Sequence, residues 1–195
     1  MSTQPVALTE PPELARRIRH IGSILLSAAT AFFFVAFLFA FLYLRALNSN
    51  GLWGAGKPHH HVHASLSIGI AILVCVLAGV AAVRLALFDL GRWLPASLAA
   101  LALGTAVVVL QIWQYAILGF GPGDGGYASV YLGWTGLFTI FVAGAVFWLE
   151  TIVAANVRAR ADVVEVESEL AAFSLFWMTL GLVEIAAFVL LFLVK

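Results

Sequence analysis

The sequence predicts an all-α integral membrane protein with five membrane-spanning helices. Five long apolar runs, at residues 21–44, 64–83, 94–118, 128–149 and 171–194, fill most of the 195 residues, and the first four contain no Asp, Glu, Lys or Arg. Each run exceeds the roughly 18 residues that mark a candidate for crossing a bilayer as a helix. Only 10% of the residues are charged, against about 25% in an average soluble domain. Because a bilayer offers the backbone no hydrogen-bond partners, each run must satisfy its own polar groups as a helix.

The helices are expected at about residues 21–44, 64–85, 94–118, 128–155 and 171–194, so that residues 21–195 form one membrane domain. Residues 1–20 are expected to form a cytoplasmic N-terminal tail. The basic residues before the first run are typical of a signal peptide. That run is longer than the roughly 7–15 apolar residues of a signal peptide, so we expect a retained helix.

The later elements follow from composition and from helix-breaking residues. The second run carries small residues such as Gly69 and Gly79, which let helix backbones approach closely in lipid. Gly119–Gly126 separates the third run from the fourth and predicts a turn. The charged segment Asn156–Glu169 is expected to be a solvated loop or an extension of the fourth helix. The fifth helix then ends the chain.

The basic residues predict the orientation in the membrane. Seven Lys or Arg residues lie in the N-terminal segment and in the second and fourth connecting segments, against three in the alternate segments. By the positive-inside rule, the N-terminus is expected in the cytoplasm and the C-terminus outside. The formal net charge is zero, so overall charge gives no reason to expect nucleic acid as a partner. The single cysteine, Cys75, excludes an intrachain disulfide.

Histidines near the start of the second run are a candidate metal site. His59 and His63 are four residues apart, so on a helix they share a face on which two imidazoles can chelate a metal ion. The alternative is an interfacial histidine cluster in contact with outer water. Neither a carboxylate nor a cysteine lies nearby in the sequence to complete a ligand set.

Among the polar side chains inside the apolar runs, three are candidates for contacts with other helices or with partner subunits. Glu184 is the only formal charge deep in a run, and an intramembrane carboxylate is a functional hypothesis by default. It is either a proton-handling group or a neutral acid bonded to a neighbouring helix or subunit. Gln111 and Gln114 share one helix face and are expected to hydrogen-bond another helix or a lipid headgroup.

Several short motifs follow a known order along the chain. Gly121-Pro122 is followed by the stretch 135–142, then by Trp148, and later by Ser174-Leu175-Phe176-Trp177. The first run ends in Tyr43-Leu44-Arg45. In this order the chain resembles subunit III of the haem–copper respiratory oxidases, in its short five-helix form.

The chain departs from that family mainly at polar positions. Phe138 and Phe141 stand in place of two histidines, and Gln111 and Gln114 stand in place of carboxylate residues. Met178, Gly181 and Glu184 stand in place of a histidine, an aspartate and a tryptophan, respectively. The resemblance therefore carries over the family's scaffold role and not its proton-uptake role.

The resemblance implies a two-helix bundle and a three-helix bundle with phospholipid held in the cleft between them. It also implies that this chain carries no redox cofactor, because haem and copper belong to partner subunits. Arg84, Arg92 and Trp93 would lie at the inner rim of that cleft, where guanidinium groups match phosphate geometry. The alternative is that these arginines only set the topology.

We therefore expect an accessory, non-catalytic subunit of a bacterial respiratory terminal oxidase in the plasma membrane. It would stabilise catalytic subunit I beside subunit II, in aerobic electron transport from cytochrome c or quinol. The chain would thus belong to an oxidoreductase complex without holding its active site. One alternative is the related accessory subunit of nitric-oxide reductase. The other is a small independent transporter, a class typically marked by internal repeats and broken helices.

Overall fold

The structure, a computed structural model, describes residues 11–48, 51, 53–54, 62–159 and 163–194. Within these residues the chain is helical and contains no β-strand. Five of its helices are long and apolar enough to cross a membrane. The prediction of an all-α fold with five helices long and apolar enough to cross a membrane is therefore confirmed.

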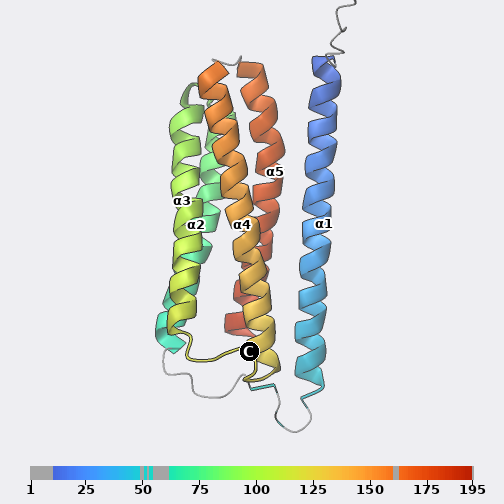
Figure 1. The fold of residues 1–195 in the computed structure, drawn as a ribbon, viewed down its shortest axis with the longest axis vertical. Helices are drawn as coiled ribbons and strands as arrows, with labels where there is room; N and C mark the ends of the chain where they lie inside the picture. Colours follow the sequence, from blue (N-terminus) through green and yellow to red (C-terminus); the bar gives the residue numbers. More distant parts are fainter. Residues whose placement is uncertain (1–10, 49–50, 52, 55–61, 160–162, 195) are drawn as a thin grey trace, which may run out of the picture.

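The helices, shown in Figure 1, are α1 (Pro12–Ala46), α2 (Val62–Phe88), α3 (Trp93–Ile117), α4 (Gly126–Ala159) and α5 (Val163–Phe188). A short 3-10 helix, η2 (Leu90–Arg92), joins α2 to α3, and a π-helix, η3 (Val189–Leu193), continues α5. The break predicted at Gly119–Gly126 is present, since α3 ends at Ile117 and α4 begins at Gly126.

Two helices begin well before the apolar runs that predicted them. Residues 12–20, assigned to the tail from the sequence, form the start of α1. The charged segment is divided between two helices, because residues 156–159 end α4 and residues 163–169 begin α5. Hydropathy marks where a helix enters lipid, whereas Glu, Arg and Ala favour helix in water as well. Pro12 is tolerated because it lies in the first turn, where its missing N–H has no helical partner.

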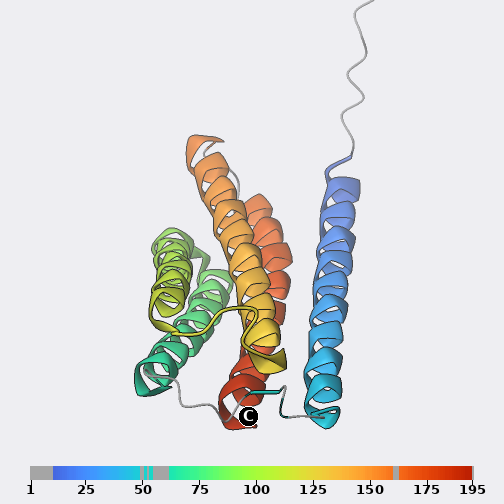
Figure 2. The ribbon, with the colours of Figure 1, turned by 60° about the horizontal axis from the view of Figure 1, so that its bottom comes forward.

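The helices α2 to α5 pack into one bundle, and α1 lies along one side of it (Figures 1 and 2). α2 packs chiefly against α3 and α5, while α1 packs against α5 and α4. The expected pairing of the first two helices in a separate bundle is thus not confirmed. α4 and α5 each contact three other long helices, α4 contacting α1, α3 and α5, and α5 contacting α1, α2 and α4.

Aromatic rings packed on glycines bring the helices of this bundle close together. The indole ring of Trp177 on α5 lies against Gly79 of α2 and Gly104 of α3. A methyl group built at either glycine would approach the ring to 2.9 Å. Trp177 is 1% exposed and lies in the core. These contacts need hydrogen in place of a side chain, which is how small residues permit close helix packing in lipid.

α1 is held to the bundle by polar contacts near its N-terminal end and by aromatic rings further along. The Ser23 hydroxyl donates a hydrogen bond to the Ala172 carbonyl of α5. Arg19 Nη1 lies 3.2 Å from Glu169 Oε1, and Glu169 Oε2 accepts a 2.7 Å hydrogen bond from Asn156 of α4. These contacts connect α1, α4 and α5 at the end of the bundle where α1 begins.

The aromatic contacts between α1 and α4 centre on Phe34, whose ring lies among rings of α4. Its centroid lies 5.7 Å from those of Trp134 and Phe141 and 6.5 Å from that of Phe138. Phe138 and Phe141 stand at the two positions where the resembled family has histidines. In this chain those positions are apolar contacts that fasten α1 to α4, and such ring pairs contribute about 0.5–1.5 kcal/mol each beyond their buried area.

Candidate polar site inside the helix bundle

Polar side chains from four helices meet inside the bundle formed by α2 to α5. We call this group the buried polar cluster; its members are Ser65, Gln111, Gln114, Tyr115, Tyr131, Thr135 and Glu184. Gln111 and Gln114 on α3 are 2% and 1% exposed. Polar groups at such burial need hydrogen-bond partners, because each unsatisfied group costs about 1–3 kcal/mol.

The two glutamines satisfy each other and join α3 to α2. Gln111 Nε2 donates a 2.8 Å hydrogen bond to Gln114 Oε1. Gln114 Nε2 in turn donates to the Ser65 carbonyl at 2.8 Å and lies 3.3 Å from the Ser65 hydroxyl. Their spacing of three residues places both amides on one face of α3, and that face is turned toward α2.

A second chain of hydrogen bonds joins α3 to α4. The Tyr115 hydroxyl donates to Thr135 Oγ1 at 2.9 Å, and the Thr135 hydroxyl donates to the Tyr131 carbonyl at 2.7 Å. Thr139 repeats this back-bond by donating to the Thr135 carbonyl at 2.7 Å. Only the bond from Tyr115 to Thr135 joins two helices, and an interhelical hydrogen bond contributes about 0.6 kcal/mol on average inside a membrane.

Glu184 brings the only carboxyl group of the cluster from α5. It is 7% exposed, and it lies within electrostatic reach of the hydroxyl groups of Tyr115 and Tyr131. The Tyr131 hydroxyl lies near Ser65 but makes no hydrogen bond of ordinary geometry with a described residue. No described Lys or Arg forms an ion pair with Glu184.

In this arrangement Glu184 is a lone carboxyl near the hydroxyl groups of two tyrosines. An apolar interior tolerates a lone carboxyl as a neutral acid, a form that can donate or accept hydrogen bonds. No three His, Cys, Asp or Glu side chains come together within the described parts of the chain. Glu184 lies near the middle of its apolar run, so the cluster reaches toward the middle of the bilayer.

Sequence reasoning named three members of this cluster and missed four. Gln111, Gln114 and Glu184 were singled out, and the structure brings them into one cluster. The missed members are Ser65, Tyr115, Tyr131 and Thr135. On α4 a signal was present, because Tyr131, Thr135 and Thr139 recur every four residues and so share one helix face.

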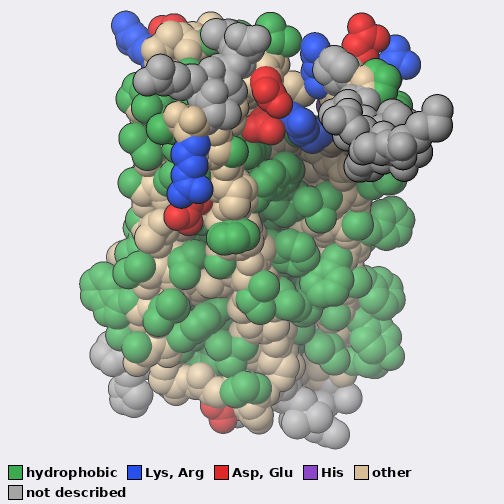
Figure 3. Space-filling view, turned by 45° about the horizontal axis from the view of Figure 1, so that its top comes forward, with side chains coloured by type: hydrophobic (Ala, Val, Ile, Leu, Met, Phe, Trp, Pro, Cys, Tyr) green, Lys and Arg blue, Asp and Glu red, His purple; other side chains and the backbone are tan. Residues whose placement is uncertain are grey.

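The predicted lipid-binding residues lie around the turn between α2 and α3, at the end of the bundle where charged side chains gather in Figure 3. Arg84 lies over the ring of Phe88, 5.9 Å from its centroid. Arg92 Nε lies 3.3 Å from Asp89 Oδ2, and both side chains are largely exposed. Trp93 is half-buried at the start of α3. The structure therefore places these residues around the turn between α2 and α3, away from α1.

The structure does not test the predicted metal site at His59 and His63. His59 lies outside the described residues, and His63 is in the first turn of α2 with its side chain outside them. The metal hypothesis for this pair stays a prediction.

Comparison with known proteins identifies no related family or protein. No protein-family model matches the chain, and no curated protein matches it either. The resemblance to oxidase subunit III therefore stays a prediction from the motifs.

Proposed function

We propose that this protein is an accessory, non-catalytic membrane subunit of a bacterial haem–copper terminal oxidase. The observation that carries the proposal is the interior of the five-helix membrane protein. Its buried polar side chains bond one another between neighbouring helices, and its carboxyl group has no charged partner among the described residues. Such an interior suits a scaffold whose helices are apolar on most sides and face lipid or a partner.

In the proposed complex the chain binds catalytic subunit I, with subunit II alongside, in the plasma membrane. Haem and copper lie in those partners, and the electron donor is cytochrome c or quinol. The N-terminus is cytoplasmic and the C-terminus outside, as the distribution of arginines indicates. The proposal does not require a two-plus-three division of the helices.

The deciding experiment is to purify the native complex through a tag on this chain. The expected result is co-purification of a large catalytic subunit with bound copper and an oxidase haem spectrum. A catalytic partner with non-haem iron and no copper would assign the chain to nitric-oxide reductase instead. A chain that purifies alone, with no haem protein, would contradict both versions.

The transporter alternative makes a different prediction about Glu184. The purified chain alone, reconstituted in vesicles, would then move protons or a solute, and Glu184→Gln would stop this movement. The accessory role predicts no such movement by the isolated chain.

The lipid-binding part of the proposal rests on Arg84 and Arg92 at the inner interface. Replacing both with glutamine is expected to remove tightly bound anionic phospholipid from the complex and shorten its working life, without changing initial turnover. Because Arg92 is paired with Asp89, Asp89→Asn is a control that frees the guanidinium and retains lipid. Unchanged lipid content in the double variant, measured by native mass spectrometry, would show that these arginines only set topology.

A further inference from the structure

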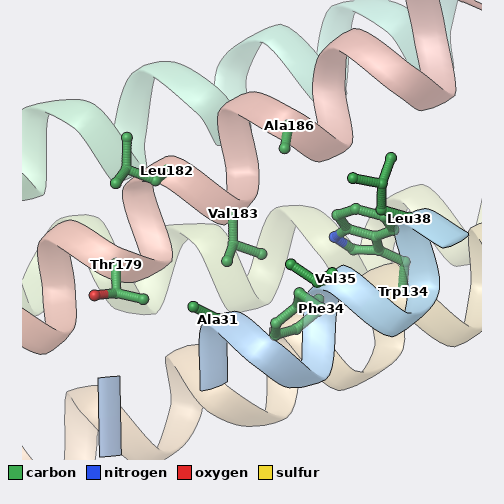
Figure 4. Close-up of a pocket in the computed structure, with 9 residues that line it drawn as sticks. All are labelled: Ala31, Phe34, Val35, Leu38, Trp134, Thr179, Leu182, Val183 and Ala186. Atoms are coloured by element: carbon green, nitrogen blue, oxygen red, sulfur yellow. The ribbon is translucent and has the colours of Figure 1, made fainter. Parts of the chain in front are cut away.

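A groove between α3 and α4 holds charged side chains, unlike an apolar hollow on another side of the bundle. That hollow, drawn in Figure 4 between α1, α4 and α5, is lined by apolar residues and Thr179, whose hydroxyl already donates to the Leu175 carbonyl at 3.0 Å. The groove has a volume of about 470 Å³, and its lining includes Glu150 and Arg158 among residues that are mostly apolar. Hydrocarbon tails fill an apolar hollow, but they do not pair with a charge.

Glu150 lies well inside the apolar part of the bundle. A methyl group at Gly104 of α3 would lie 2.6 Å from Val146 Cγ2 of α4, so these two residues are at the same level. Glu150 is one helical turn beyond Val146, toward the end of the bundle at which α3 begins with Trp93. At 1.5 Å per residue, Glu150 therefore lies about 10 Å deeper than Trp93, an aromatic residue of the kind found at the membrane surface.

The carboxyl group of Glu150 has no ion-pair partner among the described residues. Its side chain is exposed, and helix side chains lean toward the N-terminus of their helix, which for α4 is the opposite end of the bundle. Glu150 therefore leans toward the middle of the membrane and not toward water. Arg158, about two turns further along α4, lines the same groove but lies outside ion-pair distance of Glu150. Because ionisable side chains inside a membrane pair with one another or face protein, this groove lacks a basic partner.

The depth of Glu150 decides which kind of molecule supplies the missing cation. A phospholipid carries its ammonium group in the headgroup region, outside a hydrocarbon core about 30 Å thick, and Glu150 lies below that region. A second copy of the chain, related by a two-fold axis along the membrane normal, would present its Arg158 at the same level as the chain's own, which falls short of Glu150. A helix of a different protein has no such restriction on the level of its Lys or Arg.

We propose that the groove between α3 and α4 docks a membrane-spanning helix of a partner subunit, with a lysine or arginine of that helix paired with Glu150. Leu98 and Val157 also line the groove, and both are 51% exposed, so apolar side chains of the partner helix pack on them. The proposal deepens the proposed function by naming the contact face, and it rests on that function only for the existence of a partner subunit.

The first test places a photoreactive benzophenone amino acid at position 98 of the full chain in native membranes. Leu85 of α2 is the matched control, because it is a leucine of similar exposure, 49% against 51%, near the same end of the bundle but outside the groove. The expected result is a crosslink from position 98, and not from position 85, to a membrane-spanning segment that carries a Lys or Arg. The proposal is overturned by no crosslink from position 98, by equal crosslinking from both positions, or by a crosslink only to lipid or to a second copy of this chain.

The second test is Glu150→Gln, with Glu167→Gln as its control. Glu167 is an exposed acid near the start of α5, outside the groove. In complexes purified through a tag on this chain, Glu150→Gln should reduce the amount of retained partner by about tenfold or more, because the partner's charge is left unpaired. Glu167→Gln should retain the partner in full. Glu150→Lys, combined with a change of the crosslinked segment's basic residue to glutamate, should restore the partner.

Full retention of the partner by Glu150→Gln would overturn the docking proposal and leave the accessory role standing. The opposite failure is also distinguishable. If no haem protein co-purifies with the unaltered chain while position 98 still crosslinks to a basic membrane-spanning helix, the oxidase assignment fails and the docking proposal stands.

Discussion

Gly104 is expected to be one of the least replaceable residues of the bundle. It lies on α3 where Val146 of α4 and Trp177 of α5 converge. A methyl group at this position would lie 2.6 Å from Val146 Cγ2 and 2.9 Å from Trp177 Cη2. Both distances are shorter than real contacts allow, so Gly104→Ala must move the side chain of Val146, the buried indole or the helix itself.

The size of the effect follows from comparison with Gly144. Both glycines lie inside helices, and a methyl group at Gly144 would meet nothing within 4 Å. Replacing either by alanine gains up to about 1 kcal/mol of helix propensity, so this gain cancels between the two variants. The remaining difference is the cost of overpacking, about 1–3 kcal/mol. Gly104→Ala should therefore unfold more easily than Gly144→Ala by that amount.

The assay is reversible unfolding in mixed detergent micelles, followed by helical circular dichroism. A second variant locates the strain, because Gly104→Ala combined with Val146→Ala removes the shortest contact and should recover part of the lost stability. Equal unfolding free energies for Gly104→Ala and Gly144→Ala would refute the packing argument.

Three further predictions concern polar contacts. Gln114→Leu removes the acceptor of Gln111 and should cost about 1–3 kcal/mol of unfolding free energy. Adding Gln111→Leu removes the amide that Gln114→Leu leaves unpaired, so the double variant should lose less unfolding free energy than the two single variants together. Additive losses would contradict the pairing. Glu184→Gln keeps the size and the hydrogen bonding of the neutral acid, so turnover of the complex should fall by less than about tenfold. A larger loss would show that the carboxyl handles protons. Arg19→Gln breaks the partly exposed ion pair with Glu169 and should cost about 0.2–1 kcal/mol. The cost should shrink at high salt, and a salt-independent cost would assign it to packing.

The sequence was sufficient to predict the spans because their signal is local. Each apolar run of this chain must become a helix in lipid, whatever it packs against. The ends were less predictable, as residues 12–20 and 163–170 show, because hydropathy measures entry into lipid and not the end of a helix. The turn at Gly119–Gly126 was predictable because glycine and proline act through the backbone, and Gly119 indeed has a φ of 66°.

The neighbours of each helix could not be predicted in the same way. A soluble helix marks its buried face with apolar residues, but spanning helices are apolar on nearly all sides, so the pattern names no partner face. Gln111 and Gln114 were recognisable as polar residues on one face, yet their contact with Ser65 of α2 depends on the rotation of both helices. An apolar hollow lined by Phe34, Trp134 and Val183 likewise exists only because α1 lies against α4 and α5.

The sequence by itself determined that this protein has five helices long and apolar enough to span a membrane, and it singled out three of the polar residues that the structure buries. Only the tertiary structure decided that α1 lies beside the other four helices, that Trp177 packs on Gly79 and Gly104, and that Glu184 joins the cluster of Gln111. The physical reason is that burial in lipid is decided residue by residue along the chain. Helix association in lipid depends on close packing and on a few hydrogen bonds between residues far apart in sequence.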